Sequence, residues 1–353
     1  MINCKLGKIA IIKNGKCNRQ DAILNGKYPL FDRSQVIKTS NDYIFDCPAI
    51  IVPGEGKEFI PRFYQGKFNL HQRCYCIQSR NNDQVSIKYL YYNILFNRHY
   101  FARVAVGSTV PSLRLVSFED MDLQIHTPAE QQHIVDTIGS VDDLIENYDN
   151  QAHIICSLLK AELKKFSTVI PFSFYSPRII KSGIKTFDTT KIYLDTSSVE
   201  GVNEIFEGEA ITFCRRPSRA NMQPIANSVW FAKMKASNKI IVVSERDTDL
   251  ITETLFSTGF MGIEATKNLP LSLLTAFLIS DNFHVKRDMC SVGTTMASIN
   301  NDSFLKITVP YLNSKEIDLF ESKYKYPVQT LCLLRRKIAH LKQAKAYLLA
   351  KYF

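Results

Sequence analysis

The sequence predicts an α+β fold in which two pseudo-repeated mixed α/β domains are separated by two long helices that pair as an antiparallel coiled coil. Three observations lead to this prediction: a repeat with a fixed offset, two long apolar stripes with helical spacing, and two regions rich in short β-type runs. The chain has 353 residues, of which 45% are hydrophobic, so each domain can build its own core.

The repeat is clearest in two octets, residues 106–113 (VGSTVPSL) and 292–299 (VGTTMASI), which lie 186 residues apart. Three further features share this offset: Phe118 and Phe304, Glu130 and Glu316, and the apolar runs 89–92 and 275–278. A shared offset over four separate features is not expected by chance. It predicts that one structural frame occurs twice in the chain.

A helical region is expected after each octet. In the first, Thr127 is a capping residue, Pro128 suits the first helical position, and Glu130 completes a capping box. We expect this helix to be interrupted at residues 139–140 and to restart as a longer helix that ends near residue 167. The second region starts near Ser314 and is expected to be interrupted at residues 326–327, the same place in the repeat.

The two long helices carry matching stripes whose spacing alternates between three and four residues, which is typical of a coiled-coil seam. The stripes are Ile145, Tyr148, Ala152, Ile155, Leu159, Glu162 and Phe166 in the first helix, and Leu331, Leu334, Ile338, Leu341, Lys345, Leu348 and Tyr352 in the second. Each long helix is expected to have about 27 residues and to be roughly 40 Å long. Pairing in an antiparallel sense is the simplest arrangement, and the alternative is that the stripes dock onto the globular domains.

The remaining segments contain short β-type runs such as 49–53 and 239–244, separated by turn signals. We therefore divide the chain into a first domain (1–126), a central helical spacer (127–170), a second domain (171–312) and a C-terminal helical spacer (313–353). The repeated parts form the scaffold, and the divergent centres of the two domains are interpreted as variable reading surfaces.

The net charge of +10 favours an acidic partner, and nucleic acid fits best, although many basic proteins bind no DNA. The nine cysteines lack a pairing pattern, which is typical of free thiols in a reducing cytosol. His71, Cys74 and Cys76 lie close together in sequence, but strand packing explains them better than a metal site. With no apolar segment long enough for a signal peptide or a membrane span, we expect a cytoplasmic protein.

Catalytic signatures are not found in the sequence. It contains no G-x-x-x-x-G-K-[ST] phosphate loop, no paired-histidine metal motif, and no Asn/Asp-Pro-Pro-Tyr/Phe tetrapeptide of the amino-methyltransferases. We therefore predict no catalytic residue and no enzyme activity for this chain alone.

The clearest candidates for DNA contact lie in residues 214–224 (CRRPSRANMQP), which follow a β-type run. Arginine reads guanine edges and Asn or Gln reads adenine edges, and the prolines favour an exposed loop over a helix. The candidates are Arg215, Arg216, Arg219, Asn221 and Gln223. The alternative is a solvated basic turn.

The first half offers a sparser set of polar and basic candidates: Arg33, Ser34, Lys67, Asn69, Gln72 and Arg73. The octets contribute small hydroxyl residues: Ser108, Thr109, Thr294 and Thr295. Such a turn can approach a phosphate and fix the register of the protein on DNA. The hydroxyls could equally cap the segment that follows.

These segments resemble one known family. Residues 127–148 (TPAEQQHIVDTIGSVDDLIENY) resemble the central spacer of the specificity subunits of type I restriction–modification systems, and residues 105–115 (AVGSTVPSLRL) are similar to the turn that closes their recognition domains. The segments 28–34, 53–56 and 69–73 resemble one type of recognition domain, and the segments 193–201, 215–224 and 283–287 resemble another. The resemblance covers nearly the whole chain.

The resemblance implies that each domain is a target-recognition domain reading one half of a bipartite, asymmetric site in double-stranded DNA. It adds Lys286 and Arg287 to the DNA-contact candidates. The helices would set the unread spacing and dock methyltransferase subunits, through residues such as Gln131, Gln132, Ile134, Val135, Ile138 and Phe320. The cofactors S-adenosylmethionine, ATP and Mg²⁺ would belong to the partners, which are the methyltransferase and the restriction/translocase subunits, and this chain would hold none.

Two other classes of function stay open at this point. One is a restriction or modification enzyme contained in a single chain. The other is a helical scaffold that pairs two protein partners, with an incidental basic surface.

Overall fold

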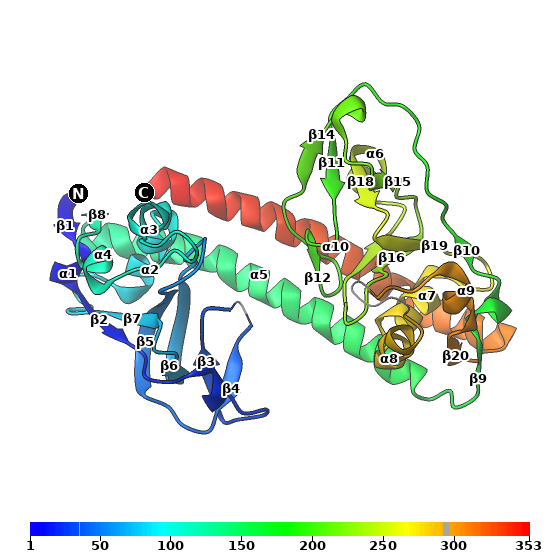
Figure 1. Ribbon diagram of the computed structural model, residues 1–353, viewed down its shortest axis with the longest axis horizontal. Helices are drawn as coiled ribbons and strands as arrows, with labels where there is room; N and C mark the ends of the chain where they lie inside the picture. The colour runs from blue at the N-terminus through cyan, green and yellow to red at the C-terminus, as the bar shows by residue number, and fades with distance from the viewer. Residues whose placement is uncertain (35, 292–296) are drawn as a thin grey trace. The chain divides into compact units, whose positions relative to one another are not determined.

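The computed structural model describes residues 1–34, 36–291 and 297–353. The chain forms two compact units, the first made of Met1–Leu144 with Leu341–Phe353 and the second of Ile145–His340. The two longest helices, α5 (Pro128–Leu163) and α10 (Ser314–Tyr352), each contribute residues to both units (Figure 1). The domain boundaries expected from the sequence stay predictions.

The first unit contains a sheet, a two-stranded ladder and short helices in addition to its shares of α5 and α10. Its strands are β1 (Ile2–Lys5), β2 (Ala10–Asn14), β3 (Tyr28–Phe31), β4 (Lys38–Ser40), β5 (Phe45–Pro53), β6 (Arg62–Leu70), β7 (Cys74–Ser79) and β8 (Asp122–Ile125). Its helices are α1 (Leu6–Ile9), the 3₁₀ turn η1 (Arg19–Asp21), α2 (Ile87–Phe96), α3 (His99–Val104) and α4 (Leu115–Glu119).

The six-stranded sheet of the first unit has the order β2-β7-β5-β6-β3-β4, and β1 pairs separately with β8. All of its pairings are antiparallel except that of β3 with β6. Successive residues of β5 alternate between the two faces. Ile50 packs with the helices in one core, whereas Ala49 and Ile51 pack in a smaller core on the other face. The smaller core also contains Cys74 and Cys76, so these cysteines serve strand packing.

The second unit is also a mixture of strands and helices. Its strands are β9 (Val169–Pro171), β10 (Arg178–Ile179), β11 (Lys191–Leu194), β12 (Val199–Glu200), β13 (Glu204–Ile205), β14 (Glu209–Ile211), β15 (Ala220–Met222), β16 (Ser228–Ala232), β17 (Ile240–Val243), β18 (Thr254–Ser257), β19 (Phe260–Glu264) and β20 (Thr308–Pro310). Its helices are η2 (Phe172–Tyr175), η3 (Phe213–Arg215), α6 (Thr248–Glu253), α7 (Leu271–Ile279), α8 (Asp281–Met289) and α9 (Asn301–Lys306).

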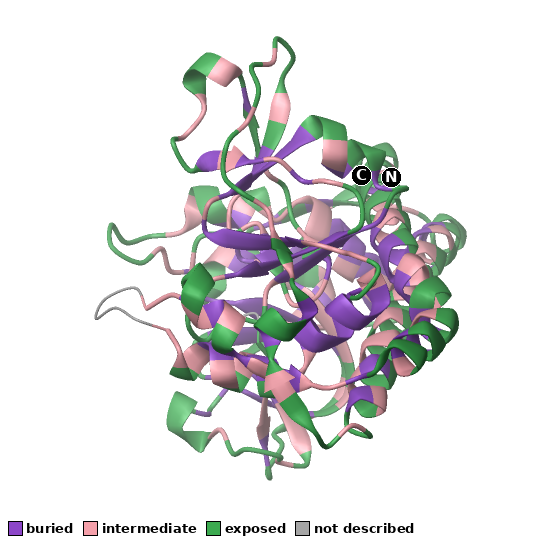
Figure 2. Ribbon diagram, turned by 90° about the vertical axis from the view of Figure 1, so that its right-hand side faces the viewer, coloured by how far each residue is buried: buried purple, intermediate pink, exposed green. Residues whose placement is uncertain are grey.

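Two four-stranded sheets organise the second unit, with the orders β10-β19-β16-β17 and β14-β11-β18-β15. The central strands are buried and the connecting loops are exposed (Figure 2). Gly262 of β19 faces the fully buried Trp230, and a Cβ atom at this position would lie 2.6 Å from the indole ring. Only glycine allows this close packing of strand against ring, so the position is specified by the core.

The offset found in the sequence recurs in the order of the elements. Helices α4 and α9, strands β8 and β20, and helices α5 and α10 begin 186 residues apart in each case. Both long helices also begin with a reciprocal cap. The Thr127 amide donates to the Glu130 carboxylate at 2.9 Å, and the Asn313 amide donates to that of Glu316 at 2.7 Å. The predicted cap of α5 is confirmed, and α10 begins with the same type of cap.

The expected interruptions of the two long helices are wrong. Helix α5 runs unbroken for 36 residues through Gly139, and α10 runs for 39 residues through Pro327. A glycine costs about 1 kcal/mol and a proline about 3 kcal/mol inside a helix. The neighbours of Pro327 offset its cost, because Tyr324, Val328 and Leu331 are buried in the core of the second unit.

Within the first unit, the start of α5 contacts the end of α10. Lys345 Nζ lies 2.6 Å from Asp142 Oδ1, and Tyr352 OH lies 3.2 Å from His133 Nε2. The two segments are antiparallel here, because a later residue of α5 contacts an earlier residue of α10. Phe353 at the end of α10 packs against Tyr89 of α2, so this part of α10 also completes the core of the unit.

Within the second unit, the end of α5 contacts the first part of α10, again in antiparallel order. The Lys337 ammonium lies 5.0 Å from the centre of the Tyr148 ring. Further along, Tyr324 OH donates to Glu162 Oε2 at 2.8 Å. Glu162 and Lys345, the charged residues of the two predicted stripes, therefore bind partners other than each other.

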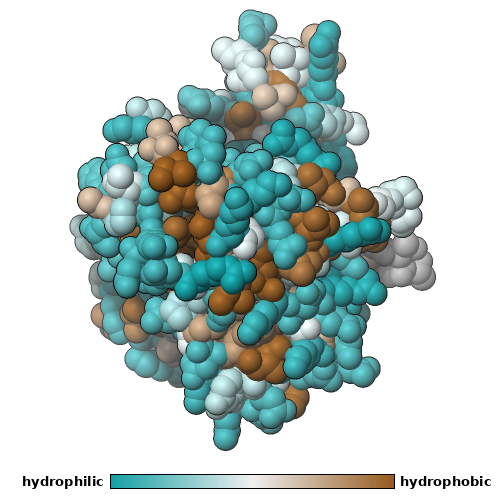
Figure 3. All heavy atoms as spheres, turned by 90° about the vertical axis from the view of Figure 1, so that its left-hand side faces the viewer, coloured by the Kyte–Doolittle hydropathy of each residue, from teal (hydrophilic) through white to brown (hydrophobic). Residues whose placement is uncertain are grey.

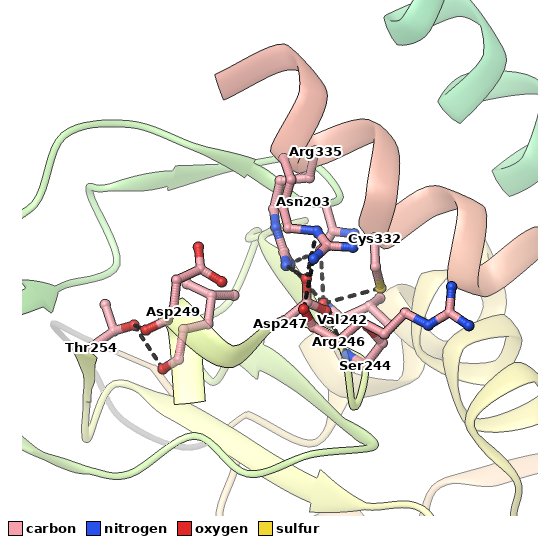
Figure 4. A network of polar contacts seen from close by, with 11 residues as sticks. Asn203, Val242, Ser244, Arg246, Asp247, Asp249, Thr254, Cys332 and Arg335 are labelled. Carbon is pink, nitrogen blue, oxygen red and sulfur yellow. Dashed lines mark hydrogen bonds and ion pairs between the residues drawn. The ribbon is translucent and has the colours of Figure 1, made fainter. Parts of the chain in front are cut away.

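A buried ion pair ties α10 to the sheet of the second unit (Figure 4). Arg335 Nη2 lies 2.5 Å from Asp247 Oδ1, and the side chains are 7% and 0% exposed. The Ser244 amide and hydroxyl donate to the other oxygen of Asp247, and Arg335 Nη1 donates to the Val242 carbonyl at 2.7 Å. Because both charges are shielded from water, their mutual pairing fixes the helix against β17.

No helix in the described part of the chain combines the length and the apolar character that crossing a bilayer requires.

Candidate nucleic-acid interface

A glycine turn after β5 lies next to the octet in the first unit. Gly54 donates to the Arg73 carbonyl at 2.8 Å and accepts from the Leu113 amide at 2.8 Å, and Gly56 donates to the Pro111 carbonyl at 3.0 Å. A Cβ atom on Gly54 would lie 2.7 Å from the Arg73 carbonyl oxygen, and Gly56 has a φ of +137°. Both glycines are therefore required for the turn and the octet to meet.

Two arginines converge on Glu55, the residue between these glycines. Arg33 Nη1 donates to one oxygen of its carboxylate and Arg73 Nη1 donates to the other. The arginine side chains are 46% and 55% exposed, whereas that of Glu55 is 12% exposed. The group thus presents two oriented guanidinium ions with one net positive charge.

The octet itself forms a tight exposed loop. The amide of Val106 donates to the Ser112 carbonyl at 2.9 Å, and the Ser112 amide donates back at 2.8 Å. Ser108 and Thr109 are exposed at the tip of this loop. Their position beside the Glu55 turn fits a phosphate contact near the two arginines, and neither hydroxyl makes a capping bond that the structure records.

The second unit repeats this arrangement at the end of β16. Met234 forms an isolated antiparallel bridge with Ser298, as Glu55 does with Ser112, and the two serines are 186 residues apart. The Lys235 amide donates to the Ala297 carbonyl at 2.9 Å. The predicted contacts Thr294 and Thr295 lie outside the described residues.

Two cations flank the neighbouring turn at residues 258–259. The Thr258 amide donates to the Arg219 carbonyl, and the Lys233 amide donates to the Gly259 carbonyl, each at 2.9 Å. Burial lowers the pKa of Lys233, and the positive charge of Arg219 lowers it further. A negative charge near this pair would relieve the repulsion between its members.

The other candidates in the loop after β14 have different positions. Arg215 is exposed, whereas the half-buried Arg216 donates to the Phe213 carbonyl at 2.9 Å and lies 4.2 Å from the centre of the Phe213 ring. Asn221 is half-buried, and its carbonyl accepts from the Gly183 amide at 2.9 Å. Arg215 and Arg219 are therefore the exposed cations of this loop.

Four predicted DNA contacts use their polar groups inside the units, and their contact with DNA stays a prediction. Asn69 is buried and bonded to Cys17 and Ser40, and Arg287 is buried and bonded to Asp288 and Ser237. Gln223 donates to the Ile251 carbonyl at 2.6 Å and accepts from Lys191 at 3.2 Å. Lys286 Nζ donates to Thr308, to its carbonyl at 2.9 Å and to its hydroxyl at 2.5 Å.

The remaining predicted contacts of the first unit lie on its surface. Ser34 is exposed, and its amide donates to Asp32 Oδ1 at 2.8 Å in the turn that carries Arg33. Gln72 is exposed and donates to Asn18 at 2.7 Å. Lys67 lies far along β6 from the Glu55 turn, with its ammonium 4.7 Å from the centre of the Tyr43 ring. The structure therefore does not bring Lys67 together with Arg33 and Arg73.

The residues expected to dock a partner are mostly internal. Ile134, Ile138 and Phe320 are buried in the cores of their own units. Gln131 is also buried, and its amide group donates to the carbonyls of Gln84 and His126. These four residues lie inside their own units, and a role in docking stays a prediction for them. Val135 is half-buried, and Gln132 is the exposed member of the set.

Sequence reasoning missed Glu55 and Lys233. Both follow the end of a strand, but a single acid between glycines and a single lysine carry no motif. Only the tertiary structure identifies these two residues, since each lies where the end of a strand contacts an octet.

Hydrophilic residues cover most of the face in Figure 3, which shows the left-hand side of Figure 1, and apolar groups lie between them. In the described ranges, the acids, histidines and cysteines form no cluster suited to a metal ion.

Comparison with known proteins agrees with these features. Residues 3–154 match the family described as "Type I restriction modification DNA specificity domain". A 156-residue segment, 44% of this chain, is 27% identical to the "Type I restriction enzyme EcoDI specificity subunit" of Escherichia coli. That segment spans 34% of the relative, so the chain matches about a third of the relative's length.

One solved structure shares the fold over the whole chain. It is the crystal structure of the type I restriction–modification S subunit from M. genitalium, with a TM-score of 0.54 and 15% identity. The alignment covers 100% of this chain and 96% of that chain.

The fold and the two equivalent turns define a mixed α/β protein. The match of residues 3–154 to the type I restriction modification DNA specificity domain confirms the resemblance to specificity subunits.

Proposed function

We propose that this chain is the DNA-reading specificity subunit of a type I restriction–modification complex. Each unit reads one half of a bipartite, asymmetric site, the first with Arg33 and Arg73 and the second with Arg219 and Lys233. One observation carries the proposal: the same junction of strand end and octet occurs in both units, and in each it lies beside two cations. One frame with two different sets of side chains suits a site with two different halves.

Helices α5 and α10 would pair as an antiparallel coiled coil that sets the spacing between the half-sites. The contacts of Asp142 with Lys345 in one unit and of Glu162 with Tyr324 in the other support this order. The helices would also dock methyltransferase subunits, with Gln132 as an exposed candidate.

The chain would act without catalysis of its own. S-adenosylmethionine, ATP and Mg²⁺ would bind to the methyltransferase and restriction/translocase partners in the cytoplasm. The family description, which names DNA specificity, supports this division of labour.

The test is a genome-wide map of methylated adenines in cells that hold the methyltransferase partner, with and without this gene. We expect one bipartite motif with a fixed spacer, which disappears with the gene. Methylation or cleavage of DNA by the purified chain alone would support the single-chain enzyme instead. Absence of any sequence-selective binding, even with the methyltransferase present, would support the scaffold.

The individual parts have separate tests. Arg219→Ala should alter only the half-site read by the second unit, and equal weakening on every sequence would identify a phosphate contact instead. Removing one turn from both long helices shortens each by about 5 Å. This deletion should change the spacer in the methylated motif, and an unchanged spacer would contradict the role of the helices.

A further inference from the structure

Glu55, which lies between Arg33 and Arg73, has no charged counterpart at the equivalent place in the second unit. There, the residue that pairs with the octet serine is Met234, which is 38% exposed. The scaffold position is the same, and its side chain is an acid in one unit and a thioether in the other. A different side chain at a repeated place in the frame indicates a role that differs between the half-sites.

The backbones of the two arginines are fixed independently of Glu55. The carbonyl of Arg73 accepts from Gly54 at 2.8 Å. Arg33 precedes Ser34, whose carbonyl accepts from Arg62. The neighbouring Asp32 accepts from Ser34 and Lys38, and although burial raises its pKa, these bonds outweigh burial and hold the pKa to about 2. Asp32 therefore remains charged and holds the turn at neutral pH.

Glu55 orients the two guanidinium groups and leaves some of their N–H donors free to bind DNA. Its side chain is 12% exposed, and each of its oxygens accepts from one arginine. A guanidinium has five N–H donors in a rigid fork, so one bond to Glu55 leaves donors free. An arginine held in this way loses less conformational freedom when it binds than a free surface arginine does.

The chemistry of the free donors selects one base. Guanine presents two acceptors, O6 and N7, on its major-groove edge, and an arginine fork matches both. Phosphate could also accept from a guanidinium, but an acidic neighbour lowers the net charge that attracts phosphate. Directed donors with a reduced net charge favour a base edge over the backbone.

Resting on the proposed function, we propose that Glu55 is a positioning residue that holds Arg33 and Arg73 for recognition of guanine in the half-site read by the first unit.

The test uses the full chain in complex with its methyltransferase partner, and compares Glu55→Gln with Glu58→Gln. Glu58 is exposed in the same loop, so the two variants lose the same charge. Binding is measured on the mapped site, on variants with single base changes in each half-site, and on random duplex, over a range of salt concentrations.

Glu55→Gln should lower base discrimination and raise the affinity for random duplex. Discrimination at one or two guanine positions of the first half-site should fall roughly ten- to a hundredfold, and the second half-site should be unaffected. Binding to random duplex should strengthen, with a salt dependence steeper by about one phosphate contact, because the arginines are released from their acid. Glu58→Gln should leave discrimination unchanged.

A second variant keeps the proposal testable if Glu55→Gln unfolds. Arg73→Lys keeps a positive charge near Glu55 but loses the fork. Replacing guanine by 7-deazaguanine in the first half-site removes the N7 acceptor. This base replacement should weaken DNA binding by the complex that contains the wild-type chain. It should have little further effect on DNA binding by the Arg73→Lys complex.

Three outcomes would overturn the proposal. The first is a Glu55→Gln complex that discriminates as well as Glu58→Gln. The second is a fall in specific and random binding together, which indicates only a structural role. The third is a first half-site without guanine on either strand. If the unmodified complex shows no bipartite selectivity, the proposed function itself fails, and this outcome is distinct from the other three.

Discussion

The buried ion pair between Arg335 and Asp247 allows the attachment of α10 to be tested quantitatively. Replacing Asp247 by Asn removes the charge that faces Arg335 at 2.5 Å and Arg336 at 3.5 Å. The Arg335 side chain is 7% exposed, so its charge would stay buried without a counter-ion. Breaking one member of a buried pair costs about 3–5 kcal/mol.

That loss should be visible in thermal unfolding of the second unit. For a unit of roughly 200 residues, each 1 kcal/mol lowers Tm by about 2–4 °C, so Asp247→Asn should lower it by about 6–20 °C. Lys160→Met is the matched control in the same unit. Its partner Asp281 is 72% exposed, and loss of such a surface pair costs at most about 1 kcal/mol.

Replacing both partners distinguishes the ion pair from simple packing. The double variant Asp247→Leu with Arg335→Met removes both charges, so it should be more stable than Asp247→Asn. Calorimetry of all four proteins gives the comparison. Equal Tm values for Asp247→Asn and Lys160→Met would refute the view that buried charge, rather than apolar contact alone, holds α10 on the sheet.

Three further predictions concern stability. Glu162→Gln should destabilise the chain by about 1 kcal/mol at pH 7. The hydrogen bond from Lys165, with those from Tyr324 and Lys323, outweighs burial and lowers the pKa of Glu162 to about 2, so the difference between variant and parent should shrink as pH falls from about 4.5 toward 2 in denaturant titrations. A stability difference between variant and parent that widens in acid would contradict this. Gly54→Ala should cost roughly 1–3 kcal/mol, because its Cβ would lie 2.7 Å from the Arg73 carbonyl, and unchanged urea unfolding would disprove the close approach. Gly139→Ala should stabilise α5 by up to about 1 kcal/mol in the same assay, because the nearest atom to its Cβ would be the flexible end of Lys88 at 3.4 Å, and a loss of stability would show a tighter fit.

The sequence predicted well those features that depend on local chemistry. The cap at Thr127 and Glu130 needs only residues three positions apart, and the structure forms it. The start of each long helix 186 residues apart was likewise readable from the repeat. The stripe positions, from Ile145 to Tyr352, are all buried or half-buried, because helical spacing places them on one face.

The failures concern features that tertiary packing decides. Pro327 and Gly139 were expected to break helices, but buried neighbours outweigh the local cost. Asn69 and Arg287 have side chains suited to DNA, and no local pattern shows that they are buried among internal partners. Glu55 was missed because its two arginines come from β3 and β7 turns that are distant in sequence.

The division of the chain has a consequence for synthesis on the ribosome. The first unit requires Leu341–Phe353, whereas the second is the continuous segment Ile145–His340. Leu349 is buried among residues of the first unit, and Tyr352 and Phe353 pack against the same core. During translation the second unit therefore has all of its residues before the first one does. The first unit begins to be synthesised first, but its core stays incomplete until Leu341–Phe353 are added. We therefore expect the first unit to depend on chaperones in a nascent chain.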